Sequence, residues 1–186
     1  MDKTEKKYFN IAEDIFIGTV YIVPNYSTTI TVDPFTLLHN EIANLPLNST
    51  KLLVGDFNSR CGILDDYSKS FEINGKNDMI DNHLPNEVTE NRIAMTLEKL
   101  NILQRKSEDT FVNTYGRNLI EFCKNTQMAI MNGRIGKDRE FGRFTFMGST
   151  NDTQNKQRLS LVDYIIGSAN MFHYVTNLEV LNKFPE

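Results

Sequence analysis

A short apolar run that ends in a glycine, an acid and an amide constrains the fold of this chain more than any other feature. Lys51–Val54 ends in three branched apolar residues in succession, which is typical of a strand covered on both faces. Gly55, Asp56, Phe57 and Asn58 follow directly. In α/β sheets, functional side chains gather where strands end, because a strand end fixes a side chain while the next loop is open to substrate. The stretch therefore predicts an α/β fold with a site just beyond this strand.

The side chains after this strand suit phosphate chemistry. Asp56 and Asn58 are two residues apart, so in extended geometry they leave the same side of the backbone. A carboxylate there can orient a water or hold a divalent cation, and an amide can donate to a phosphoryl oxygen. On residue types alone, a turn that simply follows a strand explains these residues equally well.

The segments before this strand predict a βαβ unit. Residues 14–23 are rich in β-branched and aromatic residues and stop at Pro24, which predicts a strand with a sharp exit. Asp33-Pro34 is a typical helix start, and apolar residues at helical spacing follow up to Pro46. Strand, helix and strand in this order bring both strand ends to one edge of a sheet.

The middle of the chain predicts a loop followed by scaffold elements. Residues 61–84 are polar, and we expect a solvated loop, because its acids lack the alternating spacing of a calcium loop. These acids are Asp65, Asp66, Asp78 and Asp81. A weak helical pattern covers 93–100, an amphipathic helix starts at 113, and a buried strand covers 127–131. His39 has no ligand partner at helical spacing and is interpreted as a surface or boundary residue, His83 as a loop residue, and His173 as a helix or boundary residue.

An acid stands inside an otherwise apolar run near the end of the chain. Residues 160–167 read Ser-Leu-Val-Asp-Tyr-Ile-Ile-Gly, with Asp163 in the fourth position. Burying a carboxylate costs several kcal/mol unless it is paired, so Asp163 is expected to have a partner or to hold a cation. Without a partner, Asp163→Asn would stabilise the chain by about 1–3 kcal/mol.

These segments together resemble one known superfamily. Gly-Asp-Phe-Asn after an apolar strand, and later Ser-x-Val-Asp-Tyr-Ile, resemble the signatures of the endonuclease/exonuclease/phosphatase superfamily, which has the DNase I-like fold. Tyr21, in a strand that ends in a proline-containing loop, is similar to a tyrosine that lies beside the scissile phosphate there. Residues 113–119, 132–134 and 142–146 are most similar to the endonucleases of non-LTR retrotransposons.

The resemblance spans nearly the whole chain and implies both a fold and a chemistry. The fold implied is a four-layer α/β sandwich of two mixed sheets with helices outside, in one domain over residues 1–186. The chemistry implied is phosphodiester hydrolysis of nucleic acid, with DNA the first expectation, using Mg²⁺ or Mn²⁺. A reverse transcriptase in a longer polyprotein is the partner that the retroelement branch implies.

Roles for individual residues follow from the same resemblance. Asp56 would lie near the attacking water and is a candidate metal ligand, while Asn58 and Tyr21 would hold the phosphoryl group. Asp163 would orient a catalytic histidine. Three further residues are candidates for contact with substrate, namely Ser160, Arg134 and Arg143; for Ser160, bracing the loop is the alternative. The arginines belong to residues 132–160, where Lys and Arg outnumber acids by six to three; a solvated hairpin is the alternative interpretation.

Two features of the superfamily are not matched. Glu5 and Glu13 do not match its metal-binding glutamate, and the chain reaches Glu186 without the terminal Ser-Asp-His, so the histidine that Asp163 would serve is not found. We therefore expect a partial domain, incomplete at both ends, with negligible nuclease activity by itself. The alternatives are a phosphomonoesterase of the same fold and a non-catalytic relic or nucleic-acid-binding module.

Composition excludes several other classes. With 40% apolar residues, including 12 Phe and 7 Tyr, the chain can build a core, and a net charge of −4 argues against a generally basic nucleic-acid binder. Cys61 and Cys123 lack the spacing of a zinc site, which fits a reducing compartment. The sequence has no signal peptide pattern and no membrane-spanning apolar run, so we expect an intracellular protein of nucleus or cytoplasm without a membrane partner.

Overall fold

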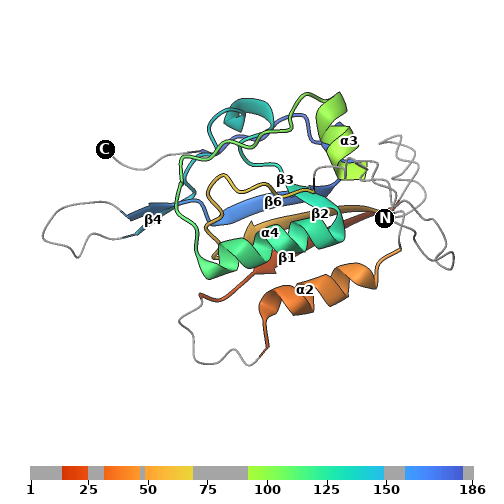
Figure 1. Cartoon of the computed structure of the whole chain (residues 1–186), viewed down its shortest axis with the longest axis horizontal. Helices are drawn as coiled ribbons and strands as arrows, with labels where there is room; N and C mark the ends of the chain where they lie inside the picture. Colours follow the sequence, from red (N-terminus) through yellow and green to blue (C-terminus); the bar gives the residue numbers. More distant parts are fainter. Residues whose placement is uncertain (1–13, 25–31, 47–48, 69–91, 149–157, 182–186) are drawn as a thin grey trace, which may run out of the picture.

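The large sheet contains both sequence motifs. The computed structural model describes residues 14–24, 32–46, 49–68, 92–148 and 158–181. The sheet has the strand order β1-β2-β6-β3 (Figure 1). Its strands are β1 (Ile15–Tyr21), β2 (Thr50–Asp56), β3 (Met128–Ile130) and β6 (Asp163–Ser168). β1 and β2 are parallel, whereas β6 is antiparallel to both of its neighbours, β2 and β3. The α/β class with a mixed sheet is thus confirmed.

The predicted βαβ unit is also confirmed. Helix α2 (Pro34–Ala43) connects β1 to the parallel strand β2. Asp33 is its N-cap, because the Asp33 carboxylate accepts from the Thr36 amide at 3.0 Å, and Pro34 occupies the first turn. The unit brings the ends of β1 and β2 to one edge of the sheet.

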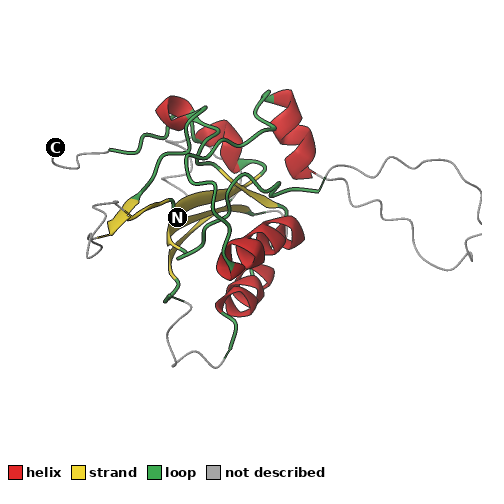
Figure 2. Ribbon diagram, turned by 60° about the vertical axis from the view of Figure 1, so that its left-hand side comes forward, coloured by secondary structure: helices red, strands yellow, loops and turns green. Residues whose placement is uncertain are grey.

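Helices cover both faces of this sheet. α2 and α4 (Thr114–Thr126) share one apolar cluster with the sheet, and the short helices α3 (Arg92–Lys99) and α5 (Met171–Tyr174) belong to a second cluster on the other face (Figure 2). Successive side chains of β2 point to opposite faces of the sheet: Leu53 packs with the first cluster and Leu52 with the second. At the outer strand β1 the second face is open, since Ile17 and Tyr21 are each 69% exposed.

The predicted strand over residues 160–167 is divided in two. β5 (Arg158–Ser160) pairs with β4 (Phe146–Gly148) in a separate two-stranded sheet, and β6 starts only at Asp163. Asp163 is therefore the first residue of a strand and is partly exposed, not enclosed in an apolar strand as the sequence predicted. The break is possible because Thr145 Oγ accepts hydrogen bonds from the free amides of Val162 and Asp163, at 3.2 and 3.1 Å.

The polar loop after β2 is more deeply integrated than its composition indicates. Asp66 is fully buried and pairs with Arg134, so the prediction of a solvated loop is wrong at this acid. Residues 69–91, which include Asp78, Asp81 and His83, lie outside the described residues, as do Glu5, Glu13 and Lys156. None of the described helices has the length and apolar character needed to cross a membrane.

Candidate functional site

Three of the predicted site residues form one row across three strands. Tyr21 of β1 lies opposite Asp56 of β2, and Asp56 lies opposite Asp163 of β6. Directly opposite residues on neighbouring strands point to the same face of a sheet. The phenol and both carboxylates therefore share the face that carries α3 and α5, at the edge where β1 and β2 end. Tyr21 is exposed and both acids are partly exposed, so the row is open to solvent.

The two carboxylates of this row repel each other. Partial burial raises the pKa of Asp56 above its ordinary value, and the negative charge of Asp163 raises it further, while hydrogen bonds from Asn58 act in the opposite direction. In the part of the chain that the structure describes, neither acid has an ion-pair partner. The site consequently concentrates negative charge that a divalent cation could neutralise.

Asn58 holds Asp56 in place. Its backbone N–H donates to Asp56 Oδ1 at 2.8 Å, and its Nδ2 donates to Asp56 Oδ2 at 3.2 Å and to the Ile22 carbonyl at 2.7 Å. Asn58 has φ 46°, in the left-handed region, so the two residues meet through a turn and not in extended geometry. Both amide hydrogens are occupied, which corrects the prediction that Asn58 donates to a phosphoryl oxygen. In this geometry Asn58 orients the Asp56 carboxylate and links β2 to the end of β1.

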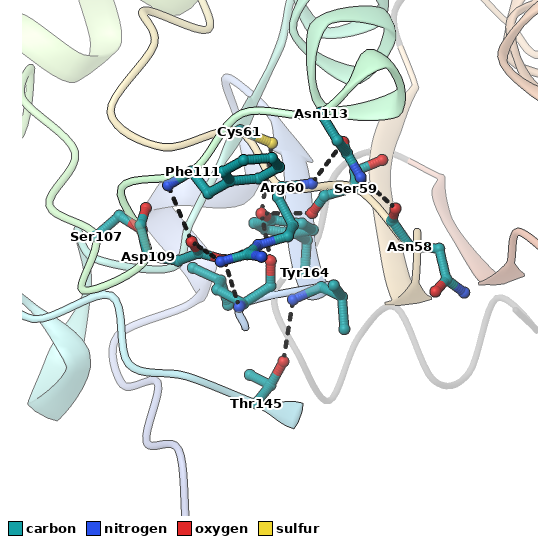
Figure 3. A network of polar contacts seen from close by, with 12 residues as sticks. Asn58, Ser59, Arg60, Cys61, Ser107, Asp109, Phe111, Asn113, Thr145 and Tyr164 are labelled. Atoms are coloured by element: carbon teal, nitrogen blue, oxygen red, sulfur yellow. Dashed lines mark hydrogen bonds and ion pairs between the residues drawn. The ribbon is translucent and has the colours of Figure 1, made fainter. Parts of the chain in front are cut away.

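The loop after β2 is anchored to β6 and to α4. Phe57 is buried and meets Tyr164 edge to face, with ring centroids 6.0 Å apart. The Tyr164 hydroxyl lies 2.9 Å from the carbonyl oxygens of both Ser59 and Leu161, to which it can donate. At α4, the Asn113 side chain accepts from the Arg60 amide and donates to the Asn58 carbonyl (Figure 3). The loop that positions Asn58 is therefore rigid.

Glycine at position 116 makes this docking possible. A Cβ atom at Gly116 would lie 1.9 Å from the Arg60 carbonyl oxygen, so no other residue allows α4 to approach the loop so closely. The same holds at Gly55, where a Cβ atom would lie 1.9 Å from the Val20 carbonyl oxygen of β1.

Two polar residues that brace Asp163 were not among the predicted site residues. Thr145 accepts from the Asp163 amide, as described above, and Asn132 Nδ2 donates to the Asp163 carbonyl at 3.3 Å. Asn132 Oδ1 in addition accepts from the Ile165 amide at 2.9 Å. Asn132 follows β3 as Asn58 follows β2, so a polar amide after a buried strand was the signal that could have identified it.

The three residues predicted to contact substrate differ in their exposure. Arg134 is buried and donates to Asp66 and to the carbonyls of Ile130, Ile102 and Leu103, so its assignment to substrate is wrong for this structure. Ser160 is buried too, and its carbonyl accepts from the Thr145 amide, which makes it a brace within the β4–β5 pair. Arg143 is partly exposed and stacks on Phe141, and its contact with substrate stays a prediction.

The described histidines lie away from the row. His39 is on α2, which packs on the opposite face of the sheet, and His173 is on α5, which follows the far end of β6. Among the described residues no group of three or more His, Cys, Asp or Glu side chains is arranged to hold a metal ion. Asp56 and Asp163 offer two carboxylates, and Mg²⁺ is commonly bound by one or two carboxylates together with waters and the oxygens of a substrate phosphate.

Searches of this chain against models of known protein families, against curated proteins and against solved structures found no match.

Proposed function

We propose that the row of Tyr21, Asp56 and Asp163 is the phosphate-binding part of a metal-dependent phosphodiesterase site that acts on nucleic acid as an endonuclease. The observation that carries this proposal is the alignment, across three neighbouring strands, of a phenol and two carboxylates that have no ion-pair partner among the described residues. The resemblance of the Gly-Asp-Phe-Asn and Ser-x-Val-Asp-Tyr-Ile segments to the endonuclease/exonuclease/phosphatase superfamily also supports it. The four-layer sandwich belongs to the same proposal, with the exposed β1 surface around Ile17 as the part that a second sheet would cover, and with Tyr21 at the strand end left open to substrate.

Each residue has a distinct task in this proposal. Asp56, fixed by Asn58, orients the attacking water. Asp163 places a second carboxylate beside it. Tyr21 donates its phenolic hydrogen to a non-bridging oxygen of the scissile phosphate. A Mg²⁺ or Mn²⁺ ion held by the two carboxylates would neutralise charge on the phosphoryl group.

Turnover by this chain is expected to be negligible. The superfamily that the chain resembles uses a catalytic histidine, and the described histidines, His39 and His173, lie elsewhere in the fold. Phosphodiester binding therefore tests the proposal more sensitively than hydrolysis does. Two carboxylates about 5 Å from a phosphate, at the dielectric constant of water, oppose binding by roughly 0.8 kcal/mol each. Their neutralisation by a cation should strengthen binding about ten-fold.

The test is the magnesium dependence of oligonucleotide binding, measured by fluorescence anisotropy with Mg²⁺ and with EDTA. The wild-type chain should bind DNA about ten-fold more tightly with Mg²⁺. The double variant Asp56→Asn/Asp163→Asn should bind without Mg²⁺ about as well as the wild type binds with it. Glu121→Gln/Glu179→Gln removes the same charge from exposed positions and serves as the matched control, which should behave as the wild type does.

An identical Mg²⁺ response in the wild type and in the aspartate double variant would contradict the proposed site. A supercoiled plasmid with Mg²⁺ or Mn²⁺ measures hydrolysis in parallel, and we expect at most a trace of nicking, which Asp56→Asn abolishes. Binding with no Mg²⁺ response and no Asp56-dependent nicking would favour the non-catalytic binding module, and hydrolysis of phosphomonoesters in place of plasmid would favour the phosphomonoesterase.

A further inference from the structure

The described part of the chain contains two units in which an aspartate pairs with an arginine that lies over an aromatic ring. In the first, Asp66 pairs with Arg134 at 2.7 Å, and the guanidinium lies 6.0 Å from the centre of the Tyr67 ring. All three residues are buried, so this unit is part of the scaffold. The second consists of Asp109, Arg60 and Phe111, which we call the Phe111 platform. Only the second unit has an accessible ring, since Phe111 is 56% exposed.

In the Phe111 platform, the Asp109 carboxylate orients the Arg60 guanidinium under the Phe111 ring. Arg60 Nε and Nη2 donate to the two oxygens of Asp109, at 2.7 and 2.6 Å, and the guanidinium lies 4.6 Å from the centre of the Phe111 ring. The Asp109 carboxylate is buried and also accepts from the amides of Phe111 and Leu161, at 3.1 and 3.0 Å. The guanidinium under the ring is therefore oriented before any ligand binds, which lowers the entropy cost of binding.

The platform stands beside the proposed phosphate site. Arg60 follows Asn58 by two residues on the same anchored loop, and Asn113 hydrogen-bonds to both residues. Figure 3 shows the guanidinium of Arg60 under the Phe111 ring, with Asn58 on the other side of Ser59. Within the described residues, Nη1 of Arg60 has no hydrogen-bond partner, so it can donate to a phosphate oxygen next to the scissile one.

We propose that the Phe111 platform binds an unstacked nucleobase next to the scissile phosphate, so that the preferred substrate is single-stranded or unpaired nucleic acid. This inference rests on the proposed phosphodiesterase function. An exposed aromatic ring backed by an arginine binds any base face by stacking, whereas a base inside a duplex has both faces covered already. Asp109 offsets the charge of Arg60 but leaves Nη1 able to donate a hydrogen bond to a phosphate on either side of that base.

The test compares a labelled single-stranded oligonucleotide with its duplex, by fluorescence anisotropy at one salt concentration with Mg²⁺ present. The wild type should bind the single strand more tightly than the duplex. Phe111→Ala should weaken single-strand binding about ten-fold and leave duplex binding unchanged. Phe111→Tyr keeps the ring and should keep the wild-type affinity.

Phe141→Ala is the matched control, because Phe141 is also exposed and also stacks on an arginine, Arg143, at 4.6 Å. It should leave single-strand binding unchanged. Equal wild-type affinity for both nucleic acids, equal losses in Phe111→Ala and Phe141→Ala, or no binding at all would overturn the inference. The readouts are separate: the Mg²⁺ response reports on Asp56 and Asp163, and the preference for single strands reports on Phe111.

Discussion

Neutralising Asp66 should cost this fold far more stability than neutralising an exposed acid in a similar ion pair. The Asp66–Arg134 pair is 2.7 Å long, with side chains 0% and 1% exposed. The Lys137–Glu179 pair is nearly as short, at 2.9 Å, but its side chains are 68% and 39% exposed. Asp66→Asn and Glu179→Gln remove the same charge from pairs that differ mainly in burial.

The expected magnitudes follow from that difference. Breaking a buried pair by removing one partner leaves an uncompensated charge and costs about 3–5 kcal/mol. The cost at Asp66 should lie toward the upper end, because Arg105 is also buried nearby and its Nε and Nη1 have no hydrogen-bond partner in the described part of the chain. The exposed pair should contribute no more than about 1 kcal/mol.

Urea denaturation followed by circular dichroism measures both variants. A third variant, Asp66→Leu/Arg134→Met, removes both charges and should recover part of the loss, because replacing a whole buried pair by apolar residues is often nearly neutral. Similar losses in Asp66→Asn and Glu179→Gln would refute the burial argument. So would a double variant no more stable than Asp66→Asn.

The Asp66–Arg134 pair should also make the stability of the fold depend on pH. Burial alone would raise the pKa of Asp66, but the charge and hydrogen bonds of Arg134 bring that pKa below its ordinary value. A carboxyl whose pKa is lower in the folded state stabilises the fold above its unfolded pKa, about 3.9. That contribution is lost as the pH falls through the folded pKa. The urea concentration at the unfolding midpoint of the wild type should therefore decrease as the pH is lowered below about 4. The midpoint of Asp66→Asn should lack the part of this decrease that comes from Asp66.

Three further predictions concern the site and its supports. Asp163→Asn should stabilise the fold by roughly 0.2–1 kcal/mol in denaturant melts, because it removes a like charge directly opposite Asp56. This gain is smaller than the gain expected for an enclosed acid. Since the pKa of Asp56 is raised, the gain should grow as the pH rises above about 4 and Asp56 becomes charged. Asn113→Ala removes the N-cap of α4 and should cost about 1–2 kcal/mol in the same melts, whereas Asn118→Ala should cost much less. Burial raises the pKa of Cys61 to about 11 and that of Cys123 well above its ordinary range, so neither thiol should react with a thiol reagent at pH 8 until the chain unfolds; rapid labelling of the native protein would contradict their burial.

The sequence was sufficient to predict most of the scaffold. Asp33-Pro34 predicted the start of α2, and the apolar run ending at Gly55 predicted β2, because capping and hydrophobic periodicity are local properties. The pairing of Tyr21, Asp56 and Asp163 across three strands could be anticipated only from the resemblance, since register depends on contacts between distant segments.

Errors arose where long-range partners decide the environment of a polar residue. Asp66 looked like an acid of a solvated loop and Arg134 like a surface cation, yet 68 residues of chain separate two groups that neutralise each other in the interior. Asn58 was expected to face substrate, but the turn at φ 46° directs its amide to Asp56 and to the Ile22 carbonyl. Residue type alone predicts neither the burial of the Asp66–Arg134 pair nor the orientation of the Asn58 amide.

The central claim is that Asp56 and Asp163 hold a divalent cation together with a phosphodiester. Mn²⁺ titration of the isotopically labelled chain, in the presence of a short oligonucleotide and followed by NMR, tests it most directly, because the paramagnetic ion broadens signals of nearby nuclei first. We predict that the amide signals of residues 56–58 and 163 disappear at the lowest Mn²⁺ concentrations, and that they persist in Asp56→Asn/Asp163→Asn. First broadening at other acids, such as Asp65 or Glu179, or an unchanged pattern in the double variant, would contradict the claim.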